Sequence, residues 1–172
     1  QEILVAPYND LETVAALIRE HKDDLAGIIV EPFQRLIPPQ PGFLEGLRKL
    51  TTEHGIVLCF DEVVTGFRFA YGGAQEYYGV TPDICTMGKA IGGGFPLAAI
   101  GGKAEIMAHF DKGAVPEEQF MTQIGTLSGN PVAAAAGLKT LEILKRPGGY
   151  THMFAQGQAL MAGYEASMKK HG

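Results

Sequence analysis

Two charged side chains, Asp61 and Lys89, each follow a short apolar run that is typical of a buried strand. Residues 56–60 lead directly into Asp61, and residues 84–87 precede Gly88 and Lys89. A lysine amine forms a Schiff base with an aldehyde, and a carboxylate holds a pyridine nitrogen in its protonated form. The pair therefore favours chemistry based on pyridoxal 5'-phosphate (PLP), in which the protonated ring acts as an electron sink.

The surroundings of Lys89 differ from those of an ordinary surface lysine. Gly88 precedes it, Met87 and Ile91 flank it, and residues 92–94 are all glycine. No other charged residue lies within five positions of it. We expect Lys89 to lie in an apolar, glycine-lined pocket, because such a pocket favours the neutral amine that Schiff-base exchange and proton transfer require.

Nucleotide binding is a second interpretation of the same residues. An apolar strand that ends in two carboxylates, as at Asp61 and Glu62, also occurs at magnesium sites of nucleotide hydrolases and at strand ends without a ligand. Hydrolases need a Gly-x-x-x-x-Gly-Lys-Ser/Thr loop, whereas Gly88 and Lys89 are followed by Ala90. A nucleotide-binding module remains the alternative from a different class, and a non-catalytic interaction domain is a third.

Residues 125–131 read Gly-Thr-Leu-Ser-Gly-Asn-Pro and are a candidate phosphate cradle. Asn130 followed by Pro131 predicts a helix start, and the hydroxyl groups and backbone amides at such a start bind phosphate well. A capped helix without a ligand explains the same pattern equally well. No Cys or His cluster has metal-ligand spacing, so we expect no metal site.

The composition indicates one domain of ordinary size. The chain has 172 residues, of which 46% are hydrophobic and 19% charged, with a net charge of -5 and no long basic cluster. A nucleic-acid partner is therefore not expected, and no apolar run is long enough for a membrane span. Cys59 and Cys85 lie within apolar runs, which favours reduced core residues in a cytoplasmic protein over a disulfide.

Strand and helix patterns alternate along the chain. Asn9 and Glu12 resemble a capping box before the first helix, and residues 1–7 are interpreted as a strand entered in mid-chain. Spacing predicts further strands at 25–30, 56–60, 84–87 and 97–100, and helices from residue 11, at 43–50, near 75, at 104–110, at 131–145 and from about 150. The alternation predicts an α/β fold with a mainly parallel sheet sandwiched by helices.

These segments together resemble the class III aminotransferases, a family of fold-type I PLP enzymes. The matching residues are Glu31–Pro32, the run from Phe60 to Arg68, Pro82–Asp83, residues 88–94 and residues 125–131, in that order. The resemblance covers nearly the whole chain. Within the family, residues 70–75, 78–83 and 125–131 are most similar to the glutamate-1-semialdehyde 2,1-aminomutase branch. The link between Pro32 and Pro38 is shorter than is usual in the family.

The resemblance implies roles for four residues. Lys89 would bind the cofactor and move protons, Asp61 would pair with the pyridine nitrogen, and Val63 would pack on the ring face. Thr126 would reach the cofactor phosphate of a neighbouring subunit, which implies a homodimer with shared active sites. The implied reaction moves an amino group between a small-molecule amino donor and a keto or aldehyde acceptor, or within one molecule as in the aminomutase.

The resemblance also implies that residues 1–172 form the central part of a PLP-binding large domain. The family's upstream phosphate-binding segment and its C-terminal small domain have no counterpart in this sequence. We therefore interpret the chain as a piece of a longer protein and expect the piece to be inactive alone.

Overall fold

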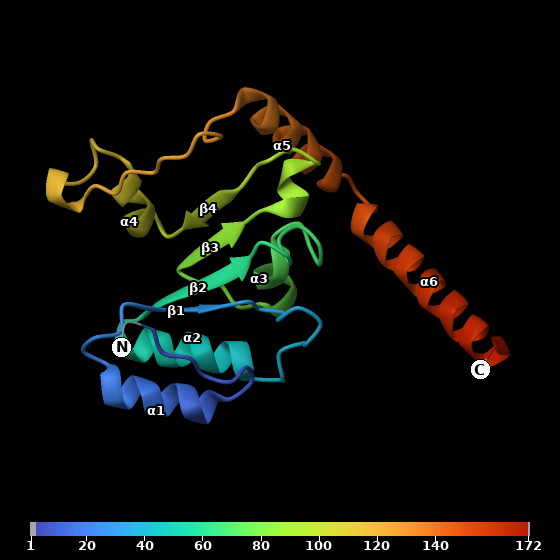
Figure 1. Cartoon of the computed structure of the whole chain (residues 1–172), viewed down its shortest axis with the longest axis horizontal. Helices are drawn as coiled ribbons and strands as arrows, with labels where there is room; N and C mark the ends of the chain where they lie inside the picture. Colours follow the sequence, from blue (N-terminus) through green and yellow to red (C-terminus); the bar gives the residue numbers. More distant parts are fainter. Residues whose placement is uncertain (1–2, 172) are drawn as a thin grey trace.

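A four-stranded sheet forms the centre of the computed structural model, which describes residues 3–171 (Figure 1). The strands are β1 (Gly27–Val30), β2 (Val57–Glu62), β3 (Ile84–Met87) and β4 (Ala99–Gly102), in that order across the sheet. Strands β1, β2 and β3 run parallel, and β4 runs antiparallel to β3. The mainly parallel sheet predicted from the sequence is confirmed.

Helices connect and flank these strands, at the positions that spacing predicts. They are α1 (Leu11–His21), α2 (Phe43–His54), α3 (Gly73–Tyr78), α4 (Ala104–Met107), α5 (Pro131–Leu144) and α6 (Gly149–His171), with short 3-10 turns η1 (Lys89–Gly92), η2 (Ala108–Phe110) and η3 (Glu117–Gln119). Within residues 3–171, none of the helices has the length and apolar character needed to cross a membrane.

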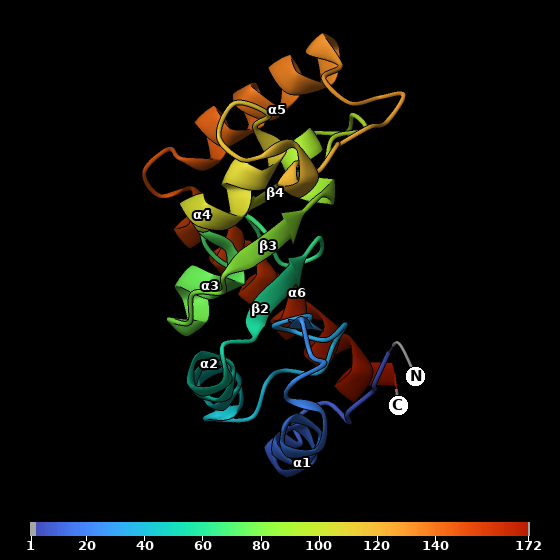
Figure 2. The same cartoon turned by 90° about the vertical axis from the view of Figure 1, so that its left-hand side faces the viewer.

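Helices α1 and α2 pack on one face of the sheet and form the hydrophobic core with it. Figure 2 shows both helices end-on at one end of the molecule and α5 at the other. Side chains alternate along β2: Leu58 and Phe60 are fully buried against the helices, whereas Cys59 and Asp61 are half-buried on the other face. Burying one Leu or Phe side chain contributes roughly 1.5–3 kcal/mol to stability.

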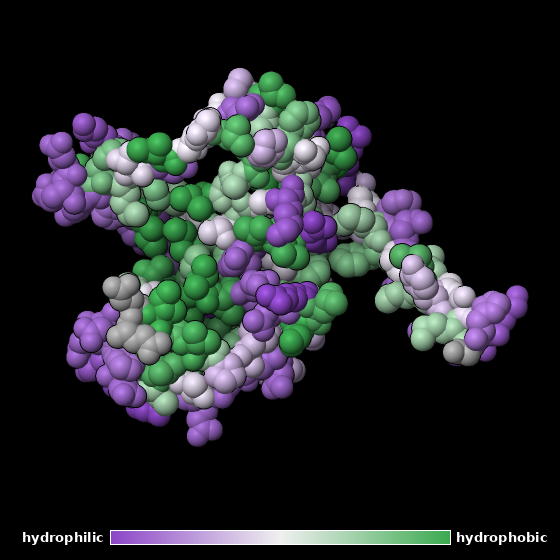
Figure 3. Space-filling view, in the orientation of Figure 1, coloured by the Kyte–Doolittle hydropathy of each residue, from purple (hydrophilic) through white to green (hydrophobic). Residues whose placement is uncertain are grey.

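The second face of the sheet is partly exposed over the described residues. Ile29 on β1 is 67% exposed and Ile100 on β4 is 39% exposed. Ile84 and Thr86, on β3, are half-buried. Figure 3 shows hydrophobic groups gathered over the strands. The two faces therefore differ in covering, and the half-buried carboxylate of Asp61 belongs to the more open one.

The start of α1 differs from the expected capping box. Asp10 caps the helix: its Oδ1 accepts from the backbone N–H of Thr13 at 2.9 Å, and its Oδ2 accepts from the Thr13 hydroxyl at 2.6 Å. Asn9 instead has a left-handed backbone, with φ of 68°, and its Oδ1 accepts from the N–H of Gln40. Both Asn and Asp are suitable cap residues. Because Asn9 is bonded to Gln40 in the proline-rich link, Asp10 takes the cap position.

Besides the start of β1, which lies at Gly27 and not at residue 25, two predicted strand positions are wrong. Residues 3–6 form no strand, and Val5 is 83% exposed, because β1 pairs with β2 alone in the described sheet and offers these residues no hydrogen bonds. Residues 1–2 lie outside the described part of the chain. The last strand begins at Ala99 and not at Leu97, because the N–H of Leu97 turns back to the carbonyl two positions earlier at 2.9 Å.

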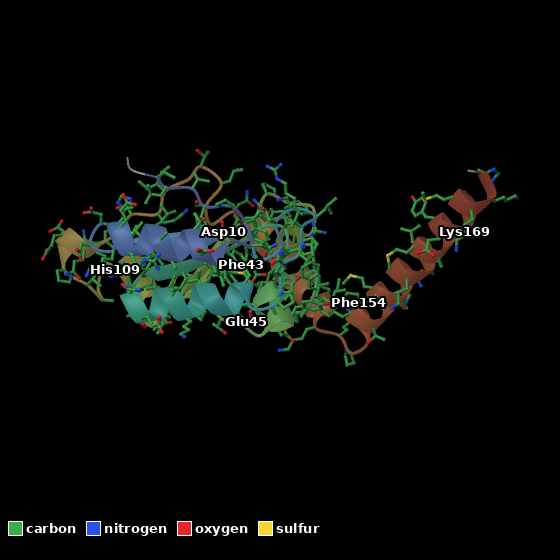
Figure 4. All side chains as sticks on the ribbon, turned by 90° about the horizontal axis from the view of Figure 1, so that it is seen from below. Asp10, Phe43, Glu45, His109, Phe154 and Lys169 are labelled. Atoms are coloured by element: carbon green, nitrogen blue, oxygen red, sulfur yellow. The ribbon has the colours of Figure 1, made fainter. Side chains whose placement is uncertain are left out.

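Helix α6 projects away from the sheet (Figure 1, Figure 4). It has 23 residues, none of them buried, and extends roughly 35 Å at about 1.5 Å per residue. The Tyr150 hydroxyl, near its start, donates a hydrogen bond to the backbone carbonyl of Phe67 at 3.0 Å. This contact ties the base of the helix to the loop that follows β2.

Candidate active site

The carboxyl ends of β1, β2 and β3 meet at one edge of the sheet, because these strands are parallel. Asp61 lies at this end of β2, directly opposite Thr86 on β3. Lys89 follows Met87, the last residue of β3, by two positions and begins η1. The two residues singled out in the sequence thus come from neighbouring strand ends, which is where open α/β sheets bind ligands.

Asp61 presents two different oxygens. Its Oδ1 accepts hydrogen bonds from the backbone N–H of Val63 at 3.0 Å and from the hydroxyl of Thr86 at 3.2 Å. No group among residues 3–171 donates to Oδ2. Because the side chain is only half-buried, Oδ2 can accept a hydrogen bond from the N–H of a ligand.

Val63 packs against the backbone that leads into Lys89. A Cβ atom placed on Gly88 would lie 3.4 Å from Cγ1 and 3.7 Å from Cγ2 of Val63. The absence of a side chain on Gly88, which is buried, keeps the two backbone segments close. Val63 therefore lies beside the segment that carries Lys89 and two residues after Asp61.

Lys89 has a left-handed backbone, with φ of 49°. For a residue other than glycine such a conformation costs about 1–3 kcal/mol, and strain of this kind is concentrated at functional sites. The Lys89 side chain is exposed, whereas Ile91 and Gly92 are buried and η1 packs on α5. The apolar pocket expected around Lys89 is therefore not formed by the described residues, because the apolar part of the segment faces α5 instead.

Glu62, next to Asp61, has a structural environment that sequence reasoning missed. It is 1% exposed, and its carboxylate accepts from the backbone N–H of Ala74 at 2.5 Å, from the Thr65 hydroxyl at 3.1 Å, and from the side-chain amide of Gln75 at 3.0 Å. These bonds fix the start of α3 and the loop after β2. Strand alternation was the available signal, since it places Glu62 on the face of Leu58 and Phe60.

The loop after β2 holds a second strained residue, Phe67, whose φ is 62°. Its carbonyl accepts the hydrogen bond from Tyr150 described above, and its ring meets that of Tyr71 edge-on with centroids 6.0 Å apart. These contacts hold the loop at the same sheet edge as Lys89. Each of the three loops after the parallel strands therefore carries one residue with a left-handed backbone: Arg35 after β1, with φ of 56°, Phe67 after β2 and Lys89 after β3.

Thr126 is not brought together with the other three residues. It lies in an exposed turn before α5, closed by a hydrogen bond from Ser128 N–H to the Gly125 carbonyl at 2.9 Å. Helix α5 approaches η1 through Gly137 and Thr140, which lie at least six residues, or roughly 9 Å of helix rise, beyond its start. The helix start itself is as predicted, because the Asn130 side chain accepts from the N–H groups of residues 132 and 133.

Asp83 holds the opposite end of β3, and its environment was also missed. Its side chain is 6% exposed and forms ion pairs with Arg48 at 2.9 Å and Lys103 at 2.8 Å. It also accepts from the N–H of Leu58 at 2.7 Å. Burial by itself raises the pKa of Asp83, but the hydrogen bonds from Leu58, Lys103 and Arg48 outweigh burial and hold the pKa below its usual value.

Two surface hollows lie away from these residues. One of about 500 Å³ is lined by residues of α2 and the start of the α3–β3 link, and one of about 410 Å³ lies at the start of β3 and the end of β4. Neither is lined by Asp61, Val63, Lys89 or Thr126. Over the described range, no group of three or more His, Cys, Asp or Glu side chains is arranged to hold a metal ion.

Comparison with known proteins relates these features to one family. Residues 3–171 match the family described as Aminotransferase class-III. The chain is 52% identical over 172 residues to glutamate-1-semialdehyde 2,1-aminomutase 2 of Brevibacillus brevis, with 98% of this chain and 39% of the relative covered.

Two solved structures share the fold. An omega-transaminase from Sphaerobacter thermophilus superposes with a TM-score of 0.89 at 42% identity, over 98% of this chain and 38% of that one. A glutamate-1-semialdehyde-aminomutase from Pseudomonas aeruginosa, in complex with PMP, gives 0.79 at 31% identity, over 97% and 38%. The chain thus spans about two fifths of the length of these relatives. It belongs to the class III aminotransferase family.

Proposed function

We propose that the protein containing this chain is a PLP-dependent enzyme that transfers an amino group from a small-molecule donor to a keto or aldehyde acceptor. The observation that carries the proposal is the arrangement of Asp61 and Lys89 at the ends of adjacent parallel strands. The membership of the family and the PMP named for the Pseudomonas aeruginosa relative support the same cofactor.

The residues at the sheet edge fit this cofactor. Oδ2 of Asp61 has no donor among the described residues and can accept from a pyridinium N–H. Val63 is half-buried and offers an apolar surface against which an aromatic ring can pack. The amine of Lys89 is exposed on the same edge and is accessible to an aldehyde. None of these side chains has to be withdrawn from another partner to take its role.

PLP, when bound, supplies an aldehyde and an electron-accepting ring. The chain's own residues would hold it and move the proton. Lys89 Nζ would hold the cofactor at its aldehyde carbon, with the aldehyde oxygen lost as water, and its amine, once displaced by the substrate amine, would take the proton from the substrate α-carbon and later return it. Asp61 Oδ2 would keep the ring nitrogen protonated, and Val63 would fix the plane of the ring.

Thr126 would act in a second subunit. Its position in an exposed turn away from Lys89 supports a site completed by a partner, with its hydroxyl and neighbouring backbone N–H groups directed at the cofactor phosphate. We propose a homodimer with shared active sites on this ground, and a cytoplasmic location. Residues 1–172 would form the central part of the large domain.

The aminomutase reaction, which returns the amino group to the same carbon skeleton, is the alternative within the family. The relative from Brevibacillus brevis favours it, whereas the structure from Sphaerobacter thermophilus favours transfer between two molecules. The alternative of magnesium-dependent nucleotide chemistry at Asp61 and Glu62 has less support. Glu62 is buried and its oxygens accept hydrogen bonds from protein donors, so it cannot join Asp61 as a metal ligand.

Reduction of the full-length protein with sodium borohydride tests the proposal. Borohydride converts a lysine Schiff base into a stable amine, and we expect peptide mapping by mass spectrometry to find the PLP adduct on Lys89. Lys89→Arg should give no adduct and no absorbance band of a lysine Schiff base. Lys103→Arg, a change at an exposed lysine paired with Asp83, should leave both unchanged.

An adduct on another lysine would refute the assignment of Lys89. No adduct anywhere, together with thermal stabilisation by a nucleotide, would support the nucleotide-binding module instead. Neither adduct nor nucleotide stabilisation would support a non-catalytic interaction domain.

A further inference from the structure

Thr86 makes the side-chain contact that distinguishes the two oxygens of Asp61. The residues are exact partners across the parallel pair β2 and β3, so both project from the more open face of the sheet. The Thr86 hydroxyl donates to Oδ1 at 3.2 Å, and the N–H of Val63 donates to the same oxygen at 3.0 Å. Two donors on one oxygen fix the rotation of the carboxylate group.

The hydroxyl is the unusual part of this side chain in its setting. Ile84 lies on the same face of β3, and Ile100 is the partner of Thr86 on β4. A valine at position 86 would have the same shape and would match these apolar neighbours. Threonine differs from valine there by an O–H group, and the acceptor of that group is Oδ1 of Asp61.

We infer that Thr86 is a positioning residue for the reaction: it turns Asp61 so that Oδ2, and not Oδ1, meets the pyridine nitrogen of the cofactor. The inference rests on the proposed function. Without the hydroxyl, Val63 N–H is the one donor that Oδ1 keeps within the described part of the chain, and the carboxylate can rotate away from the ring. Loss of a hydrogen bond to a charged group reduces affinity or activity by roughly 10- to 100-fold, and partners that orient the ligands of metal sites have effects of the same size.

The test compares Thr86→Val with Thr86→Ser in the full-length protein. The valine variant should lower kcat by roughly tenfold or more, weaken PLP binding measured by absorbance titration, and leave KM for the amino donor within about twofold, since an interaction specific to the reacting state affects kcat. The serine variant keeps the hydroxyl and should restore kcat to within about threefold. Thr86→Ala provides a second loss of the hydroxyl if valine disturbs folding.

Thr13→Val is the matched control. It also removes a threonine hydroxyl that donates to an aspartate, Asp10, at 2.6 Å, but at the start of α1. It should lower the urea midpoint of unfolding slightly, through the weakened helix start, and leave kcat and PLP affinity unchanged.

Two results would overturn the inference while the Lys89 adduct remains intact in the wild type. The first is that Thr86→Val and Thr86→Ala, which lack the hydroxyl, keep kcat and PLP affinity within about twofold of the wild type. The other is a serine variant as impaired as the valine variant, which would assign the effect to packing. Absence of the Lys89 adduct from the wild type would remove the proposed function and this inference with it.

Discussion

The two faces of the sheet have different roles: the covered face stabilises the fold, and the more open face carries the candidate site. On the face covered by α1 and α2, Leu58, Phe60 and Glu62 are at most 1% exposed and every side-chain oxygen of Glu62 has a protein donor. On the other face, Asp61 and Thr86 are half-buried, and one oxygen of Asp61 has no donor among residues 3–171. Asp61 and Glu62 are neighbours on β2, yet one is available to a ligand and the other is bonded within the fold, because side chains alternate between the two faces.

The largest effect on stability should come from the covered face. Phe60→Ala removes a fully buried ring and should lower the free energy of unfolding of the full-length protein by about 3–5 kcal/mol. Phe60→Leu retains most of the apolar volume and should cost less than half as much. Urea unfolding measures both, and borohydride labelling of the folded protein at Lys89 should be unchanged.

A cost below about 1 kcal/mol for Phe60→Ala would contradict the buried role of this face. Loss of labelling at Lys89 in a folded Phe60→Ala variant would show that the two faces are not independent.

The ion-pair cluster around Asp83 should give the next largest effect, with a distinct dependence on pH. Asp83→Asn breaks the ion pairs that the buried Asp83 carboxylate forms with half-buried Arg48 and exposed Lys103 and should cost about 1.5–3 kcal/mol at pH 7. The pKa of folded Asp83 lies below its usual value. Its charge thus stabilises the fold fully above the unfolded pKa of about 3.9, and the stabilisation is lost as pH falls through the folded pKa.

The difference in unfolding free energy between wild type and Asp83→Asn should therefore shrink below about pH 4. Urea unfolding at pH 7 and at pH 3 measures it. Glu53→Gln is the control, because the pair of Glu53 with Lys49 is exposed, with a separation of 3.8 Å, and should contribute at most about 0.5 kcal/mol. A difference that does not change with pH would exclude a contribution from the Asp83 charge.

The sequence predicts the site residues that belong to strand ends and misses those that depend on loops. Asp61 and Lys89 are predicted from their places after apolar, strand-like runs, and in the structure both follow parallel strands whose carboxyl ends share one edge of the sheet. The bonds of Glu62 to Ala74 and Gln75 are not predicted, because the path of the loop after β2 decides them. The exposed position of Lys89 was missed for a similar reason, since η1 turns its apolar residues toward α5, a contact between distant segments.

Fold prediction shows the same division. Apolar runs and helix starts such as Asn130–Pro131 gave correct elements. Two features depend on partners from elsewhere in the chain. Asp10 and not Asn9 caps α1, and residues 3–6 form no strand. Local patterns do not encode such partners.

The division between the faces is tested most directly by the isosteric pair Asp61→Asn and Glu62→Gln in the full-length protein, each measured for kcat and for the free energy of unfolding. Asp61→Asn keeps the acceptor Oδ1 but replaces Oδ2 by an NH2 group. It should reduce kcat by roughly two to four orders of magnitude, with PLP still bound and stability within about 0.5 kcal/mol of the wild type.

Glu62→Gln should do the reverse. Its NH2 group would face protein donors that now bond to the carboxylate, so unfolding should be easier by about 1–3 kcal/mol while kcat of the folded enzyme stays within about threefold of the wild type. Near-normal turnover for Asp61→Asn, or loss of turnover for a folded and stable Glu62→Gln, would contradict the account.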